Sequence, residues 1–271
     1  MDTILSITTL CGYLLAAAFL AFAFWRAKDG AARIGNWLLA LVFVLHGVEI
    51  GVRWGAAGVA PATNPGEALS LFAWILVGGH LALQARYKVR GVGALVGMLA
   101  ALMVMGGLAF SHEGEIPEAL RSAWLPIHVS LAFLGHAALG LAFVTAVAYL
   151  IQERQVKRKR WTPLHKRLPP LETLDLVNYR CVAIGFPLLT LGILSGALYA
   201  KAELGDYWRW EPRQVWSLIT WLIFATLLHA RLTVGWRGKR TALITIVGFA
   251  VILGSFLTIR LFDLGFHSDF R

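Results

Sequence analysis

Eight long apolar runs, separated by short polar segments, make this the sequence of a membrane protein. A helix needs about 20 mainly apolar residues to cross a hydrocarbon core of about 30 Å. Hydrophobic residues make up 58% of the 271-residue chain, which is more apolar surface than one water-soluble core can hide. The sequence therefore predicts an all-α fold, a polytopic transmembrane helix bundle of about eight spans. The runs cover residues 4–25, 35–55, 68–85, 91–110, 126–151, 180–200, 215–233 and 241–262.

Little chain remains outside these runs, so residues 1–271 are expected to form a single integral membrane domain. The chain opens with Asp2 in place of a basic leader segment and shows no small-residue cleavage site, which indicates that the first run is retained as a span. Cys11 and Cys181 are the only cysteines. A disulfide framework, a CxxC redox pair and a CxxCH site are therefore excluded, and the chain is not expected to be a c-type cytochrome itself.

Basic residues alternate from loop to loop, and this alternation predicts the orientation of the chain. Of the 25 Lys and Arg residues, 18 lie in four segments and 7 lie elsewhere. Basic loops of membrane proteins face the cytoplasm. Both termini are therefore expected on the outer, periplasmic side of a bacterial inner (plasma) membrane that the chain crosses many times. The four basic segments are residues 26–33, 86–90, 154–180 and 231–240.

The net charge of +10 follows from this topology, so no nucleic-acid partner is expected. Residues 153–178 form the longest inward loop and carry a basic run, for which the expected role is an anchor near anionic membrane lipid. Only the outward loops can bring chemistry to the outer compartment. These are residues 53–67, 111–126 and 201–214 and the tail after Arg260.

Three further patterns predict packing rather than chemistry. Pro187 lies inside the sixth run and is expected to kink or locally open that helix, because proline lacks a backbone donor. Gly192 and Gly196 form a GxxxG pair, which usually allows a close helix contact. Glu49 and Arg53 lie one turn apart and are expected to form a structural ion pair.

Histidines within the spans need an explanation, because ionisable groups are costly inside a bilayer. His46, His80 and His136 lie at depth, and His229 lies toward the cytoplasmic end of the seventh span. A lone buried histidine is more often a hydrogen-bonded structural residue than a ligand. His112, His165 and the unpaired members of the set are expected to be ordinary residues.

Two histidines share a depth at the outer side of the membrane. His128 and His267 fall at the outer ends of the fifth and eighth spans. If the bundle brings these ends together, two neutral imidazoles approach an iron from opposite faces, as haem b requires. The same logic pairs His46 with His229 nearer the inner side, and His80 is the alternative partner.

The outward loop at residues 201–216, KAELGDYWRWEPRQVW, is rich in aromatic residues. A membrane-interface belt is one interpretation of such a cluster. The other is a haem platform, because flat indoles offer a macrocycle apolar faces, and Arg209 or Arg213 can pair with haem propionates. The aromatic residues of the loop are Tyr207, Trp208, Trp210 and Trp216.

Three stretches resemble the CcsA/ResC-type cytochrome c assembly proteins and their YpjD-like relatives. The resemblance implies a multi-span haem carrier that presents haem at the outer face for attachment to apocytochrome c, beside a ResB-type partner. The family is defined by its tryptophan-rich periplasmic loop. The stretches are IHVSLAFLGHAALG (127–140), YRCVAIGFPLLTLGILSGALYA (179–200) and YWRWEPRQVWSLITWLIFATLLHAR (207–231).

The resemblance also implies roles for individual histidines. In the family, two outer histidines flank the loop and ligate haem, and these positions match His128 and His267. A pair of intramembrane histidines is thought to hold haem on its way outward. His229 matches the one after the loop, and His46 matches the earlier one.

The loop departs from the family pattern W-G-x-x-W-x-W-D at two positions. Leu204 stands where the first tryptophan is expected, and Glu211 replaces the aspartate, while Gly205, Trp208 and Trp210 remain. The loss of one indole removes part of the haem platform, and the longer acid moves the carboxylate by a methylene. The GWRG stretch at 235–238 is closer to YpjD-like members.

The leading hypothesis is therefore a haem-binding assembly factor that accepts haem b from the inner side and exposes it at residues 204–216. No acid, base or nucleophile constellation is required of the chain, so it is expected to act as a transfer protein, with haem lyase activity only together with a partner. Two alternatives stay open. One is a b-haem electron-transfer subunit, and the other is a divergent, haem-free membrane scaffold.

Overall fold

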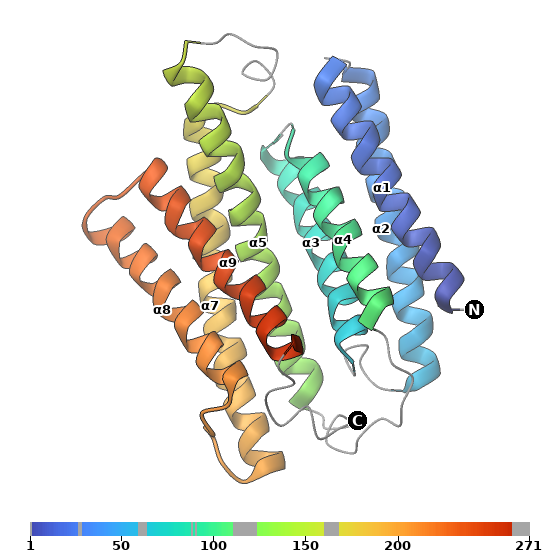
Figure 1. Ribbon diagram of the computed structural model, residues 1–271, viewed down its shortest axis with the longest axis vertical. Coiled ribbons are helices and arrows are strands. Elements are labelled where there is room, and N and C mark those ends of the chain that lie inside the picture. Colours follow the sequence, from blue (N-terminus) through green and yellow to red (C-terminus); the bar gives the residue numbers. More distant parts are fainter. Residues whose placement is uncertain are drawn as a thin grey trace. The chain divides into compact units, whose positions relative to one another are not determined.

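The computed structural model describes residues 2–26, 29–58, 64–87, 89, 91–110, 124–159 and 168–261. Within these ranges the secondary structure is entirely helical, which confirms the predicted all-α bundle (Figure 1). The helices are α1 (Asp2–Arg26), α2 (Asp29–Ala57), α3 (Pro65–Tyr87), α4 (Val92–Phe110), α5 (Trp124–Lys157), α7 (Leu171–Leu204), α8 (Pro212–Thr233) and α9 (Lys239–Leu261).

The helices follow the apolar runs closely. Among the described residues, α1 to α5, α7 and α8 are the seven helices long and apolar enough to cross a membrane, and α9 covers most of the eighth predicted run. The chain is thus a multi-pass membrane protein. Every helix except α4, which lies within its predicted run, extends beyond its run at one or both ends, because polar residues at a helix terminus continue its hydrogen bonding without adding hydropathy.

The largest difference from the sequence-based boundaries lies in the predicted inward loop at 153–178. Helix α5 continues to Lys157, and α7 begins at Leu171 rather than near residue 180, so the described ends of this segment are helical. Leu174 and Val177 are fully buried, so the segment has an apolar face at helical spacing despite its acidic residues. Pro170 directly precedes α7, and its carbonyl accepts a hydrogen bond from the Leu174 N–H.

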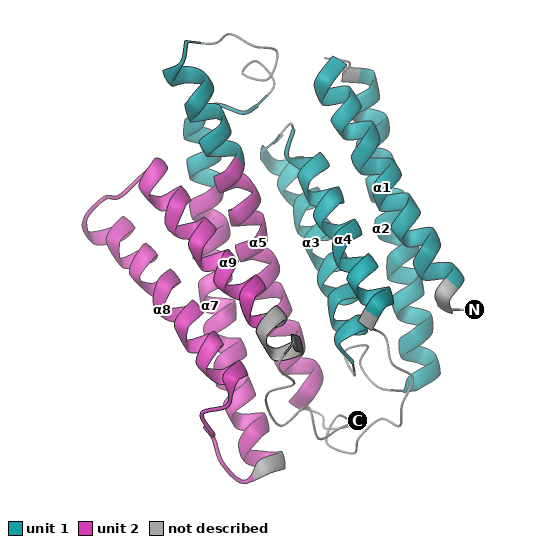
Figure 2. Cartoon of the chain, in the orientation of Figure 1, with its two compact units in different colours: residues 1–113, 148–177 teal, residues 114–147, 178–271 magenta. Residues whose placement is uncertain are grey.

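The chain divides into two compact units (Figure 2). Unit 1 comprises residues 1–113 and 148–177, and unit 2 comprises residues 114–147 and 178–271. In unit 1, α1 packs against α2 and α4, and α3 packs against α4 and α2. In unit 2, α8 packs against α9, and residues 124–147 of α5 pack against α7. Backbone geometry across Pro187 stays helical, so the proline does not divide α7.

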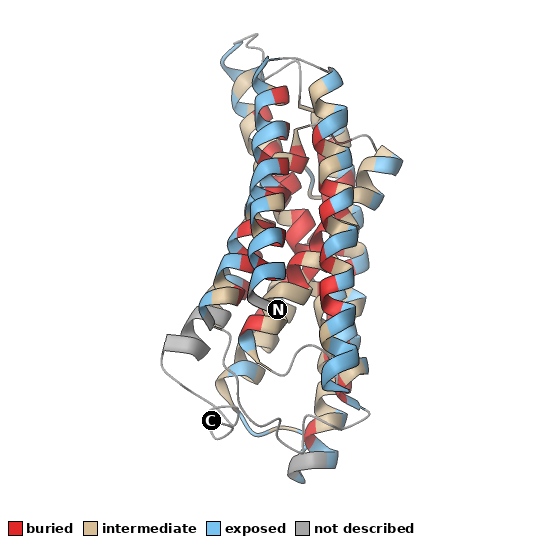
Figure 3. Cartoon of the chain, turned by 90° about the vertical axis from the view of Figure 1, so that its right-hand side faces the viewer, coloured by how far each residue is buried: buried red, intermediate tan, exposed pale blue. Residues whose placement is uncertain are grey.

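Buried and exposed residues alternate around the helices (Figure 3), and many of the exposed residues are large hydrophobic ones. On α2, Leu41, Val44 and Val48 recur at helical spacing and are more than half exposed, whereas His46 and Glu49 are buried on the other side. A water-soluble helix shows the opposite arrangement. The pattern suits a bilayer, where lipid covers the apolar face and neighbouring helices must satisfy the polar groups.

Candidate functional site

The described residues include five of the eight histidines. His46 and His80 belong to unit 1, and His128, His136 and His229 belong to unit 2. His112, His165 and His267 lie outside the described residues. The predicted pairs His128–His267 and His46–His229 therefore stay predictions, and each described histidine is compared by its own contacts.

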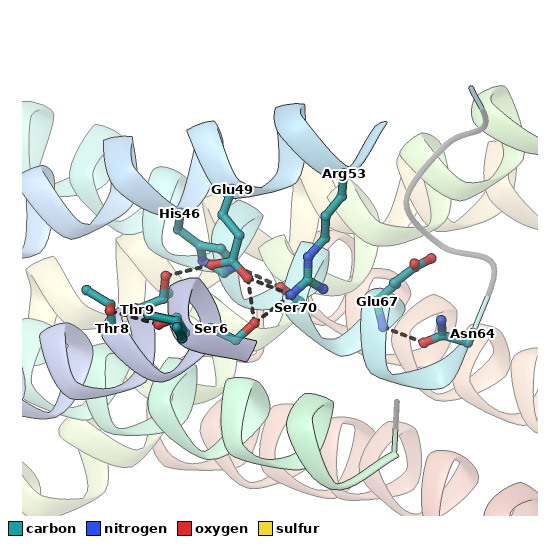
Figure 4. A network of polar contacts seen from close by, with 10 residues as sticks. Ser6, Thr8, Thr9, His46, Glu49, Arg53, Asn64, Glu67 and Ser70 are labelled. Carbon is teal, nitrogen blue, oxygen red and sulfur yellow. Dashed lines mark hydrogen bonds and ion pairs between the residues drawn. The ribbon is translucent and has the colours of Figure 1, made fainter. Parts of the chain in front are cut away.

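His46 is fully buried and both of its ring nitrogens are hydrogen-bonded (Figure 4). Its Nδ1 lies 2.9 Å from the Tyr13 hydroxyl on α1, and its Nε2 lies 2.8 Å from the Ser70 hydroxyl on α3. The Tyr13 ring also meets the imidazole edge to face, with centroids 5.6 Å apart. One neutral imidazole thereby connects three helices of unit 1, and no lone pair remains for another ligand in this arrangement.

Glu49, one turn further along α2, has its carboxylate fully compensated. It accepts hydrogen bonds from the hydroxyls of Ser6 and Thr9, each at 2.7 Å, and from the guanidinium of Arg53 at 2.9 Å. The predicted Glu49–Arg53 ion pair is therefore confirmed. Figure 4 shows that the charge lies on the α1–α2 contact, where the hydroxyls of α1 offset the cost of removing it from water.

His80 on α3 is as deeply buried as His46 but makes no hydrogen bond to the described residues. Only 1% of its surface is exposed, and both ring nitrogens lack a partner. Its ring lies against Gly93 of α4, since a Cβ built on Gly93 would lie 3.0 Å from His80 Nε2. The side-chain oxygen of Gln84, one turn away, is buried without a partner as well. Two adjacent turns of α3 thus present unsatisfied polar atoms.

His128 on α5 is half-buried against α7. Its Nδ1 lies 2.9 Å from the carbonyl oxygen of Gly192 and 3.4 Å from the Ser195 hydroxyl. A carbonyl only accepts, so Nδ1 carries the proton and Nε2 carries the lone pair. The contacts of the described residues leave Nε2 without a hydrogen bond. The close α5–α7 contact predicted from Gly192 and Gly196 is confirmed, because these glycines lie directly against Ala132 and His128.

The remaining histidines of unit 2 differ from His128. His136 Nδ1 lies 2.6 Å from the carbonyl of Ala132 on its own helix, which is a structural contact. His229 is exposed on α8. For His128, the carbonyl of a neighbouring helix fixes a single tautomer.

The tryptophan-rich loop is the non-helical segment between α7 and α8. Gly205 ends α7 with a positive φ of 88°, and its carbonyl accepts a hydrogen bond from Lys201. The Lys201 ammonium lies 5.4 Å from the centre of the Tyr207 ring. The backbone N–H of Arg209 donates to the Gln214 side chain at 2.8 Å, which ties the loop to the first turn of α8.

Trp208 and Trp210 meet edge to face, with ring centroids 5.7 Å apart. The indole N–H of Trp208 is buried without a partner among the described residues. Trp210 is 72% exposed and has a φ of 55°, a left-handed conformation that side chains other than glycine rarely adopt. Strained backbone of this kind occurs often at binding sites, so it is consistent with the haem-platform interpretation of the loop.

Trp216 and Arg213 belong to the first turns of α8 and extend the candidate site onto this helix. Trp216 is half-buried, and Arg213 interacts electrostatically with both His128 and Glu211. Glu211 thus keeps a carboxylate near Arg213 although it replaces the expected aspartate, and the Leu204 side chain lies outside the described atoms. Through Arg213, unit 2 places the loop and His128 in one neighbourhood.

The chemical groups that these residues offer are suited to binding a haem. His128 offers a neutral imidazole nitrogen, Trp208 an unpaired indole N–H, Trp210 an exposed flat ring, and Arg213 a cation for a propionate. Sequence reasoning did not identify Ser195, Tyr13 or Ser70 as histidine partners. Single hydroxyls in apolar runs carry no signal of the contacts they make across helices.

Comparison with known proteins identifies relatives over most of the chain. The family model described as "Cytochrome C assembly protein" matches residues 63–267. The chain is 34% identical to the cytochrome c biogenesis protein CcsA of Synechococcus elongatus, over 88% of each chain. It is 33% identical to the CcsA of Microcystis aeruginosa over 87% of each chain, and 32% identical to that of Guillardia theta over 86% of this chain and 84% of the relative.

Proposed function

Because this chain belongs to the cytochrome C assembly protein family, we propose that it carries haem b within the membrane and presents it at the outer face for attachment to apocytochrome c. Membership of the family supports a role in cytochrome c maturation. Haem is the cargo of this proposal. When bound, it supplies vinyl groups, across which a cysteine thiol of the apocytochrome adds its S–H to form a thioether.

The observation that carries the proposal is the state of His128. Its Nδ1–H donates to the Gly192 carbonyl, so Nε2 holds an unshared lone pair, which is the form of histidine that binds iron. His46, by contrast, has both nitrogens hydrogen-bonded. His267, which lies outside the described residues, is the proposed second ligand at the outer face.

The loop supplies the remaining contacts of this outer site. Trp208, Trp210, Trp216 and Tyr207 would cover the faces of the cargo, and Arg209 and Arg213 would pair with its propionates. Arg213 already interacts with His128, which supports a common site for the loop and the ligand. The positive φ of Trp210 keeps an indole exposed, at a cost that a binding role explains.

For the inner site, the contacts within unit 1 favour His80 over His46 as a haem ligand. Leaving a buried polar group unsatisfied costs about 1–3 kcal/mol, and lipid offers no alternative partner. His80 has two such nitrogens, whereas His46 has none. We therefore assign His80 to cargo on its way outward and His46 to the packing of unit 1.

The proposal places the chain in a bacterial inner membrane with both termini outside, as its basic residues predict. An apocytochrome c would meet the loop from the periplasm, and a ResB-type protein would act beside it. These partners follow from the family resemblance. Reporter fusions test the orientation, since a fusion after Arg160 should report the cytoplasm, and periplasmic activity there would contradict it.

The decisive experiment measures haem on the full chain purified in detergent from a haem-replete host, by pyridine haemochrome assay and Soret spectrum. Wild type should contain haem b, and His128→Ala should lose most of the outer-site haem or shift its spectrum. His136→Ala is the matched control, because it removes a histidine from the same helix. Unchanged haem in His128→Ala contradicts the ligand assignment, and a wild-type protein that binds no added haemin supports the scaffold alternative.

A further inference from the structure

Four glycines bring α5 and α7 together in unit 2, and one of them differs from the others in what it touches. A Cβ at Gly135 would lie 2.8 Å from the backbone nitrogen of Leu189. A Cβ at Gly185 or Gly192 would likewise meet aliphatic or backbone atoms of α5, at 3.0 and 3.1 Å. At Gly196, by contrast, it would lie 2.7 Å from the Cε1 atom of His128.

The absent side chain of Gly196 therefore makes room for an imidazole rather than for a backbone. The same hypothetical Cβ would lie 3.0 Å from His128 Nδ1 and 3.5 Å from Nε2, so the ring is seated by its Cε1–Nδ1 edge. One turn earlier, the Gly192 carbonyl receives the Nδ1–H at 2.9 Å. The two glycines of the GxxxG pair thus act on one ring, one by a hydrogen bond and the other by leaving space.

Ser195 completes the contact. Its hydroxyl is buried, donates to the Gly192 carbonyl at 2.9 Å, and lies 3.4 Å from His128 Nδ1. The carbonyl therefore has two side-chain donors, the serine hydroxyl and the imidazole. Because the two share one acceptor, removal of the hydroxyl should strengthen the bond from the imidazole.

We propose that Gly192, Ser195 and Gly196 form an α7 seat that positions His128 and tunes the strength with which its Nε2 binds iron. The inference rests on the proposed function and deepens it, since it identifies residues that act on the cargo through another residue. A stronger bond from Nδ1–H makes the imidazole a better electron donor. A better donor favours ferric over ferrous haem and lowers the midpoint potential.

The test uses the full chain in detergent with haem bound, and measures haem content, the Soret spectrum and the midpoint potential. Gly196→Ala should displace the imidazole and weaken haem binding about tenfold or more, the effect typical of disturbing a ligand's supporting contacts. Ser195→Ala should keep the haem content and lower the midpoint potential. Gly254→Ala is the matched control, because a Cβ at this α9 glycine meets nothing within 4 Å.

A double variant separates positioning from packing. In a His128→Ala background, Gly196→Ala should cause no further loss of haem, because the ring that it displaces is gone. An equal loss in both backgrounds would overturn the proposal, and so would a Ser195→Ala potential equal to that of wild type. A wild-type chain without haem overturns the proposed function as well, whereas a haem-loaded wild type with unaffected seat variants overturns the seat alone.

Discussion

His46 in unit 1 and His128 in unit 2 are both held by neighbouring helices, but the two are held in opposite ways. Hydroxyls from α1 and α3 bond both nitrogens of His46, and either tautomer satisfies them. A backbone carbonyl and the neighbouring hydroxyl of Ser195 hold His128 by Nδ1 alone, which allows one tautomer and leaves Nε2 free of hydrogen bonds to the described residues.

Under the proposed function, the difference separates a structural histidine from the proposed haem ligands. Burial does not distinguish them, because His46 and His80 are equally buried. The number of satisfied nitrogens does: two for His46, one for His128 and none for His80. In a solvent without hydrogen-bonding partners, each unsatisfied nitrogen has a cost that binding of a ligand removes.

The largest expected effect tests whether unit 1 is a structural unit. Glu49→Ala leaves Arg53 without its buried partner and should lower the free energy of unfolding by about 3–5 kcal/mol. Denaturant unfolding in detergent measures it. Glu153→Ala, which breaks the exposed pair with Lys157, is the control and should cost less than about 1 kcal/mol. Equal losses of unfolding free energy in the two variants would mean that the buried network stabilises the protein no more than an exposed ion pair does.

Removing the His46 imidazole, which is hydrogen-bonded at both nitrogens, should lower the stability of the protein and leave haem binding unchanged. His46→Ala leaves the hydroxyls of Tyr13 and Ser70 without their shared partner, so a loss of about 2–3 kcal/mol in unfolding free energy is expected. The Soret spectrum should stay that of wild type. A stable protein that has lost haem would instead indicate that His46 is a ligand. The distinction between His46 and His128 would then be wrong.

His80→Leu should give the opposite result. Leucine has nearly the volume of histidine and needs no hydrogen bond, so the haem-free protein should become more stable by about 1–2 kcal/mol. Haem content should fall, because the proposed inner ligand is lost. Denaturant unfolding of the haem-free protein measures its stability, and a pyridine haemochrome assay measures the haem content, so the two effects are separated. A loss of stability would indicate that His80 has a structural partner.

The smallest effect concerns the strained loop. Trp210→Asn places at a φ of 55° a residue that tolerates the left-handed region, so the protein should gain about 1 kcal/mol or less in stability. It should also bind haem more weakly, because an exposed indole is lost. Trp37→Asn, which removes a similarly exposed tryptophan from α2, serves as the control for haem binding. Equal haem affinity of wild type and Trp210→Asn would favour the membrane-belt interpretation.

Much of the fold could be predicted because hydropathy over about 20 residues is a local property. The eight apolar runs, the ion pair one turn apart and the close packing at Gly192 and Gly196 are each contained in a short stretch of sequence. The start of α7 at Leu171 was missed because that first turn is acidic as well as amphipathic. Such a segment shows no high mean hydropathy although its apolar face is buried.

By itself, the sequence determined which residues enter the membrane and which histidines have to be explained there, since both depend only on the cost of transfer from water to lipid. Tertiary structure decided which of those histidines is already satisfied. The partners of His46 lie 33 and 24 residues away, and the carbonyl that orients His128 lies 64 residues away. Hydrogen bonds over such separations arise from how helices pack, and a single sequence carries no periodicity that encodes them.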